Sequence, residues 1–199
     1  QKNPELFHGV GPFNAETGEL IKKPNPKPTY TSTFGKALIR EATANKDIVA
    51  ITAAMKDGTG LAPFSQEFPE RFIDTGITEE HAVALASGFA AGGKLPVACI
   101  YSTFLQRAID QIDIDCALAN RHVVFAVDRA GLVGDDGPTH HGTMDLVYLR
   151  MIPGMKVLAP SNEAELVDAL HTALALDGPV ALRYQRGEGT GAAVPEEPS

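Results

Sequence analysis

The stretch Val123-Val124-Phe125-Ala126-Val127, followed by Asp128-Arg129-Ala130-Gly131, decides the fold. A strand with one wet face alternates apolar and polar residues, whereas this run is continuously apolar. It therefore predicts a strand buried on both faces, as in a parallel sheet that helices cover on either side. The charged and glycine residues that follow predict a loop at the carboxyl end of this strand.

Further short runs share this apolar, β-branched character, and helical patterns lie between them. The other strand candidates are Ile48–Thr52, Phe72–Asp74, Val97–Tyr101, Lys156–Leu158 and Val180–Arg183. The helix candidates are Phe34–Ala44 after a cap at Ser32 or Thr33, His81–Ala91 after Thr78, Phe104–Asn120, and Ala164–Leu176 after Ser161. This alternation predicts an α/β fold with a mainly parallel sheet of about six strands and helices on both faces.

Composition excludes several classes of protein. The formal net charge of -8 argues against nucleic acid as a partner, because phosphate binding needs a basic surface. The chain has no apolar run of about eighteen residues, so no membrane span is expected. Cys99 and Cys116 both lie in apolar segments, and we expect them to be buried free thiols.

The chain divides into a body between two linkers. Residues 1–28 include Gly18, Pro24 and Pro26 without periodicity, and residues 188–199 are rich in Gly, Pro and Glu. The first residue is Gln1 rather than methionine. We therefore expect residues 29–187 to form one domain of a longer, multidomain protein.

Chemically rich segments follow the predicted strands, at the edge where parallel α/β sheets bind ligands. These segments are Gly76–His81, Tyr101–Arg107, Asp128–His141 and Tyr184–Arg186. Glu79 and Glu80 have two interpretations, a favourable place at a helix N-terminus or a buried catalytic carboxylate. The aromatic residues after Val97–Tyr101 belong either to the core or to a wall that stacks on a flat heterocycle. Arginines and histidines in an acidic chain fit a small anionic substrate.

Several of these segments, taken in order from Thr29 to about Gly187, resemble the 1-deoxy-D-xylulose-5-phosphate synthase family. They are Gly76-Ile77-Thr78-Glu79-Glu80-His81-Ala82-Val83, Tyr101-Ser102-Thr103-Phe104-Leu105-Gln106-Arg107-Ala108, Asp128-Arg129-Ala130-Gly131, Asp136-Gly137-Pro138-Thr139-His140-His141-Gly142 and Arg186-Gly187. Gln185 departs from the proline common in the family. The resemblance implies a thiamine-diphosphate-binding fold, of which residues 29–187 are the pyrimidine-binding domain. Diphosphate-binding and C-terminal domains are then expected before and after it.

The resemblance also implies an activity. Members of this family are homodimers that condense pyruvate with D-glyceraldehyde 3-phosphate through a thiamine-diphosphate carbanion, with loss of CO2. This is the first step of methylerythritol phosphate isoprenoid synthesis, and its product also feeds thiamine synthesis. The expected location is the bacterial cytoplasm, or the plastid for a plant protein. The alternatives are a transketolase, a 2-oxoacid dehydrogenase β-type enzyme, or a silent α/β assembly module.

The resemblance assigns roles residue by residue. Glu79 is the carboxylate that bonds the pyrimidine ring nitrogen, and Phe104 stacks on that ring with Ile77, Tyr101 and Arg107 nearby. Arg129 and Arg186 bind anionic groups, and Tyr101, Asp136 and His140 line the substrate pocket. His140 is also a candidate proton carrier.

One motif imitates a metal site. Thiamine enzymes bind Mg²⁺ and the diphosphate through Gly-Asp-Gly and a later Asn, and Asp135-Asp136-Gly137 with Asn162 looks similar. We reject the match because the first glycine is missing and Asn162 is expected to cap a helix. The metal ligands are therefore expected in the N-terminal domain, outside this chain.

Overall fold

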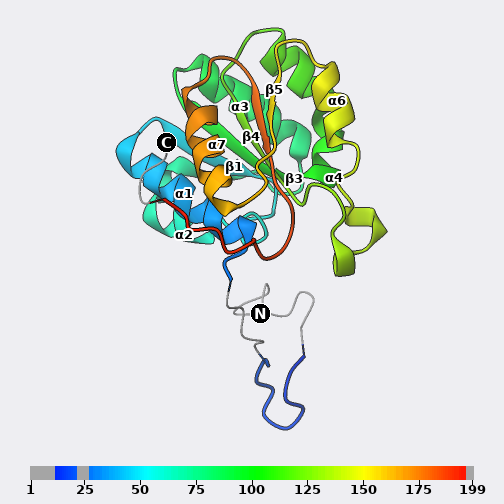
Figure 1. Ribbon diagram of the computed structural model, residues 1–199. Helices are drawn as coiled ribbons and strands as arrows, with labels where there is room; N and C mark the ends of the chain where they lie inside the picture. The colour runs from blue at the N-terminus through cyan, green and yellow to red at the C-terminus, as the bar shows by residue number, and fades with distance from the viewer. Residues whose placement is uncertain (1–11, 22–26, 196–199) are drawn as a thin grey trace.

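The computed structural model describes residues 12–21 and 27–195. Its body is one six-stranded sheet in the order β2-β1-β3-β4-β6-β5, and every strand pair is parallel (Figure 1). The strands are β1 (Ile48–Thr52), β2 (Phe72–Asp74), β3 (Leu95–Tyr101), β4 (Val124–Asp128), β5 (Lys156–Leu158) and β6 (Val180–Arg183). The predicted parallel α/β sheet is thus confirmed.

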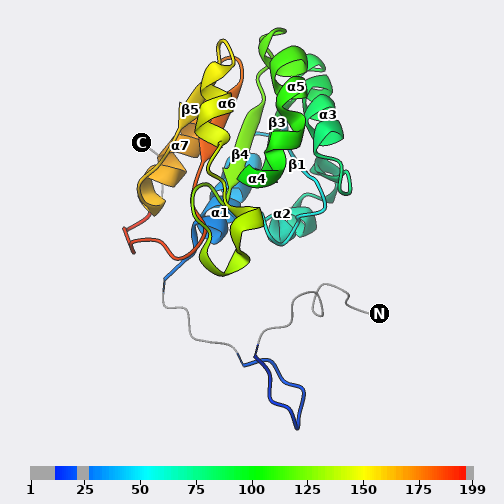
Figure 2. The ribbon, with the colours of Figure 1, turned by 90° about the vertical axis from the view of Figure 1, so that its right-hand side faces the viewer.

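Helices cover both faces of the sheet (Figure 2). One core lies between the sheet and α1 (Tyr30–Ala44), α2 (Ala62–Glu67) and α7 (Glu163–Ala175). The opposite core lies under α3 (Glu79–Ala91), the segmented helix after β3, and α6 (Asp145–Met151). Successive residues of a strand enter opposite cores, as with Ala50 and Ile51 of β1, and for this reason the central strands are apolar throughout.

The predicted cap of the first helix was wrong. Helix α1 begins at Tyr30, and its N-cap is Thr29, whose hydroxyl accepts a hydrogen bond from the Ser32 N–H at 3.1 Å. Ser32 instead lies in the first turn and donates its own hydroxyl back to the Thr29 carbonyl. The expected cap of α7 is confirmed, because the Asn162 side chain accepts from the Glu165 N–H at 3.0 Å.

The helix predicted over Phe104–Asn120 is divided into four segments. These are α4 (Ser102–Leu105), the 3-10 turn η3 (Gln106–Ala108), α5 (Ile109–Gln111) and the π-helical η4 (Ile112–Ala117). The Ser87 hydroxyl donates to the Asp115 carbonyl within the π-helical segment, and side chains that enter the hydrogen-bond ladder commonly accompany such distortions. Ile112 and Cys116 of the π-helical segment are fully buried.

Two helices escaped prediction. Helix α2 is six residues long, too short to show a period, and α6 leaves its apolar Val147 and Met151 exposed. The remaining short helical turns are η2 (Pro69–Arg71), η5 (Gly134–Asp136) and η6 (Pro138–His140).

Cys99 and Cys116 are buried free thiols, as expected, and burial raises the pKa of Cys116 to about 12. No helix in the described ranges has the length and apolar character to cross a membrane.

The segment that leaves β6 is attached to the start of α7 by Glu163, a fully buried residue. Its carboxylate accepts from the Thr190 N–H and hydroxyl, both at 3.0 Å, and from the Gly191 N–H at 2.7 Å.

Residues 1–11, 22–26 and 196–199 of the predicted linkers lie outside the described residues. Glu188, which we assigned to the second linker, forms an antiparallel bridge with Thr29 at the start of the predicted domain.

The Glu163 contacts predict acid-dependent stability. Burial alone raises the pKa of Glu163, but hydrogen bonds from Gly191, its own N–H and Thr190 outweigh burial and lower the pKa from 4.5 to about 2. A depressed folded-state pKa adds stability above pH 4.5 that is lost as the pH falls towards 2. Glu163→Gln should remove this component, so the free energy of unfolding should depend less on pH in that range.

Denaturant unfolding of the chain at several pH values measures the effect. Glu67→Gln, at an exposed carboxylate of α2, is the matched control and should keep the wild-type pH dependence. Identical pH dependence in wild type and Glu163→Gln would contradict the assignment.

Candidate active site

A cavity among the described residues lies where the strand order reverses. The chain passes from β1 outward to β2 and then returns to β3 on the other side of β1, and parallel α/β sheets bind ligands at the carboxyl ends of such strands. The cavity measures about 670 Å³. It is lined by Ala53, Ala54, Met55, Lys56, Asp57, Gly58, Asp74, Ile77, Glu79, Phe104, Arg107 and His140.

Glu79 provides a buried carboxylate in this cavity. It is the first residue of α3 and is only 3% exposed. Its Oε1 accepts a hydrogen bond from Arg107 Nη1 at 2.7 Å, and the Arg107 side chain is half exposed. A buried carboxylate needs such a charged partner, because desolvating an unpaired charge costs several kcal/mol. Among the described residues, no hydrogen bond reaches the other oxygen, Oε2.

Phe104 forms an aromatic wall beside this carboxylate. Its ring is stacked on Tyr101 with 5.6 Å between centroids and meets His140 edge to face at 5.4 Å. The Arg107 guanidinium lies 5.2 Å from the Phe104 centroid. Ile77, on the same cavity, is 79% exposed. A flat ring would find an aromatic wall, an apolar side chain and a carboxylate within this one cavity.

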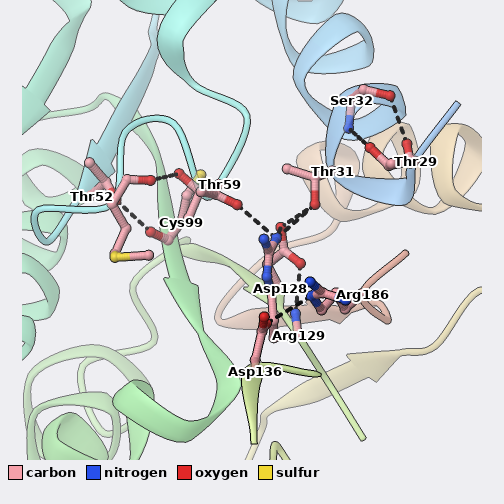
Figure 3. A network of polar contacts seen from close by, with 12 residues as sticks. Thr29, Thr31, Ser32, Thr52, Thr59, Cys99, Asp128, Arg129, Asp136 and Arg186 are labelled. Atoms are coloured by element: carbon pink, nitrogen blue, oxygen red, sulfur yellow. Dashed lines mark hydrogen bonds and ion pairs between the residues drawn. The ribbon is translucent and has the colours of Figure 1, made fainter. Parts of the chain in front are cut away.

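A second cluster adjoins the cavity, around the fully buried Asp128 (Figure 3). The Asp128 carboxylate accepts from the Thr31 hydroxyl at 2.8 Å and from the Arg129 N–H at 2.7 Å, and it pairs with Arg129 Nη1 at 3.0 Å. Burial raises the pKa of Asp128, although Arg129 and these hydrogen bonds oppose the shift. Arg129 adopts a left-handed backbone with φ of 59°.

Arg129 links this cluster to the aromatic wall. Its guanidinium lies 4.3 Å from the Tyr101 centroid, and its Nη1 donates to the Gly58 carbonyl at 2.7 Å. Burial raises the pKa of Tyr101 to about 12, so its hydroxyl is neutral at physiological pH. Arg186 pairs with Asp136 at 2.8 Å, and Figure 3 shows this pair beside Arg129.

The structure therefore brings the nine predicted site residues to one edge of the sheet in two adjoining groups. Ile77, Glu79, Phe104, Arg107 and His140 line the cavity. The second group, Tyr101, Arg129, Asp136 and Arg186, lies next to the first without lining the cavity. Their roles in binding and catalysis stay predictions.

Sequence reasoning missed the loop after β1, residues 53–58, which forms half of the cavity lining. It also missed Asp74, whose Oδ1 accepts from the Ala54 N–H at 2.8 Å and from the Gly76 N–H at 3.0 Å. An aspartate at the end of a strand, two residues before a glycine, was the available signal. The loop itself has mostly small or apolar side chains and carries no catalytic pattern.

The chain's metal-like motif has other partners. Asp136 pairs with Arg186, and Asn162 caps α7. Across residues 12–21 and 27–195, no group of three or more His, Cys, Asp or Glu side chains could hold a metal ion.

Known proteins resemble this chain in sequence and fold. The family described as "Transketolase, pyrimidine binding domain" matches residues 26–190. The 1-deoxy-D-xylulose-5-phosphate synthase of Desulfitobacterium hafniense strain DSM 10664 / DCB-2 is 58% identical over 197 residues, 99% of this chain and 31% of that protein. The Aquifex aeolicus synthase is 56% identical over the same share of the chain. The chain thus spans about 31% of the length of these relatives.

Solved structures agree on the fold. A split-gene transketolase, described as an inactive β4 tetramer, superposes with a TM-score of 0.76 at 28% identity, covering 87% of this chain and 56% of that one. The Campylobacter jejuni transketolase superposes with a TM-score of 0.77 at 24% identity, covering 90% and 29%. The chain therefore belongs to the family of transketolase pyrimidine-binding domains, and the 1-deoxy-D-xylulose-5-phosphate synthases are its sequence relatives, as its motifs predicted.

Proposed function

We propose that this chain supplies the pyrimidine-binding half of the active site of a 1-deoxy-D-xylulose-5-phosphate synthase. The observation that carries the proposal is the position of Glu79, which is 3% exposed and opens onto a cavity beside an aromatic ring. Relatives of that name are 52–58% identical to this chain, whereas the transketolase structures are 18–28% identical, and this difference favours the synthase.

The residues present fit one end of thiamine diphosphate. An aminopyrimidine is flat and has a ring nitrogen that, when protonated, donates a hydrogen bond to a carboxylate; the cavity offers Phe104 as a wall and Glu79 Oε2 as the acceptor. Ile77 and the aliphatic side chains of Ala53 and Met55 supply apolar surface around them. Nothing comparable fits the diphosphate and Mg²⁺, since no cluster of metal ligands occurs in the described ranges. We assign those groups to the N-terminal domain expected in the whole protein.

When bound, thiamine diphosphate supplies a carbon nucleophile that adds to carbonyl carbons. Glu79 would hold a proton at the pyrimidine ring nitrogen, which requires a dry site and hydrogen-bond contact. Arg107, already 2.7 Å from Glu79, would orient this carboxylate and border the bound ring. Phe104 would fix the plane of the ring by stacking.

The second cluster would receive the substrates. Pyruvate has a carboxylate and glyceraldehyde 3-phosphate has a phosphate, and both suit the planar donor fork of Arg129 and Arg186. Asp136 holds Arg186 in place at 2.8 Å. Tyr101, neutral at physiological pH, would donate a hydrogen bond, and His140 would carry protons at the cavity rim.

The finer properties of the whole protein follow from the same proposal. They are CO2 release, a place at the first step of isoprenoid synthesis and in thiamine synthesis, a homodimer, and the bacterial cytoplasm rather than a plastid. The bacterial relatives support the last choice. A 2-oxoacid dehydrogenase or a silent assembly module would not account for the high identity to the synthases.

The reaction can be tested by exchange. Replacing the matching 31% of the D. hafniense enzyme with this chain gives a protein that we call the exchanged enzyme. It should release CO2 and form 1-deoxy-D-xylulose 5-phosphate from pyruvate and glyceraldehyde 3-phosphate, as measured by product chromatography. A folded, coenzyme-loaded exchanged enzyme that only transfers ketol groups between sugars would refute the synthase assignment.

Glu79→Gln in the exchanged enzyme should lower kcat by about 10²-fold or more, because it removes a carboxylate that does acid–base work. The amide keeps the size of the side chain, so the thermal midpoint should change little. Glu80→Gln is the matched control, because Glu80 is the next residue of α3 and is exposed. Near-normal turnover of Glu79→Gln would show that this carboxylate has no catalytic role.

Arg186→Ala should raise the KM for glyceraldehyde 3-phosphate by about tenfold or more, with less effect on coenzyme affinity, since a guanidinium–phosphate bond is lost. Steady-state kinetics and coenzyme titration measure the two quantities. Arg150→Ala, at an exposed arginine of α6, is the control. Equal losses of substrate and coenzyme affinity would indicate a structural role.

A further inference from the structure

Gly58 lies in the loop after β1, where its backbone does not require glycine. The loop is closed by Thr59, whose N–H and hydroxyl donate to the Met55 carbonyl at 2.9 and 2.8 Å, and by the Leu61 N–H, which donates to the Lys56 carbonyl at 2.9 Å. Gly58 is absent from the glycines with positive φ, whereas its neighbour Gly60 has φ of 76°. Alanine at position 58 would therefore meet no backbone strain.

Glycine is needed at position 58 because there is no room for a side chain, and not because the backbone adopts a conformation that favours glycine. A Cβ at position 58 would lie 2.2 Å from the Tyr101 hydroxyl oxygen and 3.0 Å from Tyr101 Cζ. It would also lie 2.8 Å from Met55 Cε, the end of a flexible side chain that can turn away. Tyr101 cannot yield so easily, because it is 5% exposed and its ring is stacked on Phe104.

The Gly58 carbonyl contacts a second residue of the cluster, Arg129. Gly58 O accepts from Arg129 Nη1 at 2.7 Å, and Arg129 in turn lies 4.3 Å from the Tyr101 centroid. One loop residue thus touches both Tyr101 and Arg129 while it also lines the cavity. If the Tyr101 or the Arg129 side chain moved, Gly58 would move with it and displace the other side chain.

We propose that Gly58 is a positioning residue for Tyr101 and Arg129, the two proposed substrate-binding residues beside it. The absence of a side chain at position 58 leaves room for the Tyr101 hydroxyl, and the Gly58 carbonyl fixes the Arg129 guanidinium. The inference rests on the proposed function, in which Tyr101 and Arg129 bind the polar groups of the substrates. Any larger side chain at position 58 displaces the Tyr101 side chain from its present position. Substrate affinity then falls, while Glu79 and Arg107, which Gly58 does not touch, keep their positions.

The test is a double-mutant cycle in the exchanged enzyme with Gly58→Ala, Tyr101→Phe and both together. Gly58→Ala should raise the substrate KM by about tenfold or more and change coenzyme affinity by less than about twofold. In the Tyr101→Phe background the closest contact, at 2.2 Å, no longer exists, so adding Gly58→Ala should change KM by less than about threefold. Gly88→Ala, at an α3 glycine with open space around its Cβ position and no positive φ, is the control and should change nothing.

A crystal structure of the Gly58→Ala chain gives a readout independent of activity, and it should show the Tyr101 ring displaced. Unchanged KM in Gly58→Ala, or an equal effect in both backgrounds, overturns the inference. Failure of both Gly58→Ala proteins to fold overturns it too, because Gly58 would then serve folding rather than the site. An exchanged enzyme that lacks synthase activity while Tyr101 still moves in the Gly58→Ala crystal overturns the proposed function instead.

Discussion

The buried ion pair of Asp128 and Arg129 is the constraint on which the site depends. Asp128 ends the central strand β4 in complete burial, where an unpaired charge would cost several kcal/mol. Its neighbour Arg129 supplies the partner charge and adopts a left-handed backbone, which costs about 1–2 kcal/mol. The same guanidinium then reaches Thr31 at the start of α1 and Gly58 after β1. This single pair thus connects three segments that are distant in sequence, and the second cluster forms around it.

The sheet could be predicted because burial on both faces leaves a continuous apolar signal. Val124–Asp128 and Ile48–Thr52 are buried at every position, so their sequences need no partner to be recognised as strands. Helix starts were less certain, since Thr29 and Ser32 can both cap a helix and the choice depends on tertiary contacts. Thr29 bridges Glu188, about 160 residues away, and no local pattern encodes that contact.

Some residues of the candidate site could likewise be predicted from the sequence, whereas others could not. Glu79, Phe104, Arg129 and Arg186 have side chains with chemistry of their own, and their places after strands or in charged loops drew attention to them. Gly58 contributes a carbonyl and an empty volume, neither of which leaves a chemical signature in a sequence. The Glu79–Arg107 pair was hidden for another reason. Arg107 lies in the 3-10 turn that interrupts the expected helix, so its direction could not be derived from ideal helical spacing.

The cavity has a buried carboxylate inside it, but its mouth is open to solvent. Glu79 is 3% exposed, yet Ile77 on the same cavity is 79% exposed and Arg107 is half exposed. Water can therefore reach the mouth of the cavity unless another molecule or domain covers it. The chain accounts for 31% of the length of its synthase relatives, so most of such a protein is available to form that cover. Closing the mouth would exclude water from the Glu79 carboxylate and strengthen every charge interaction around it. The Glu79 carboxylate is thus in place within this domain, and a cover over the mouth has to come from outside the domain.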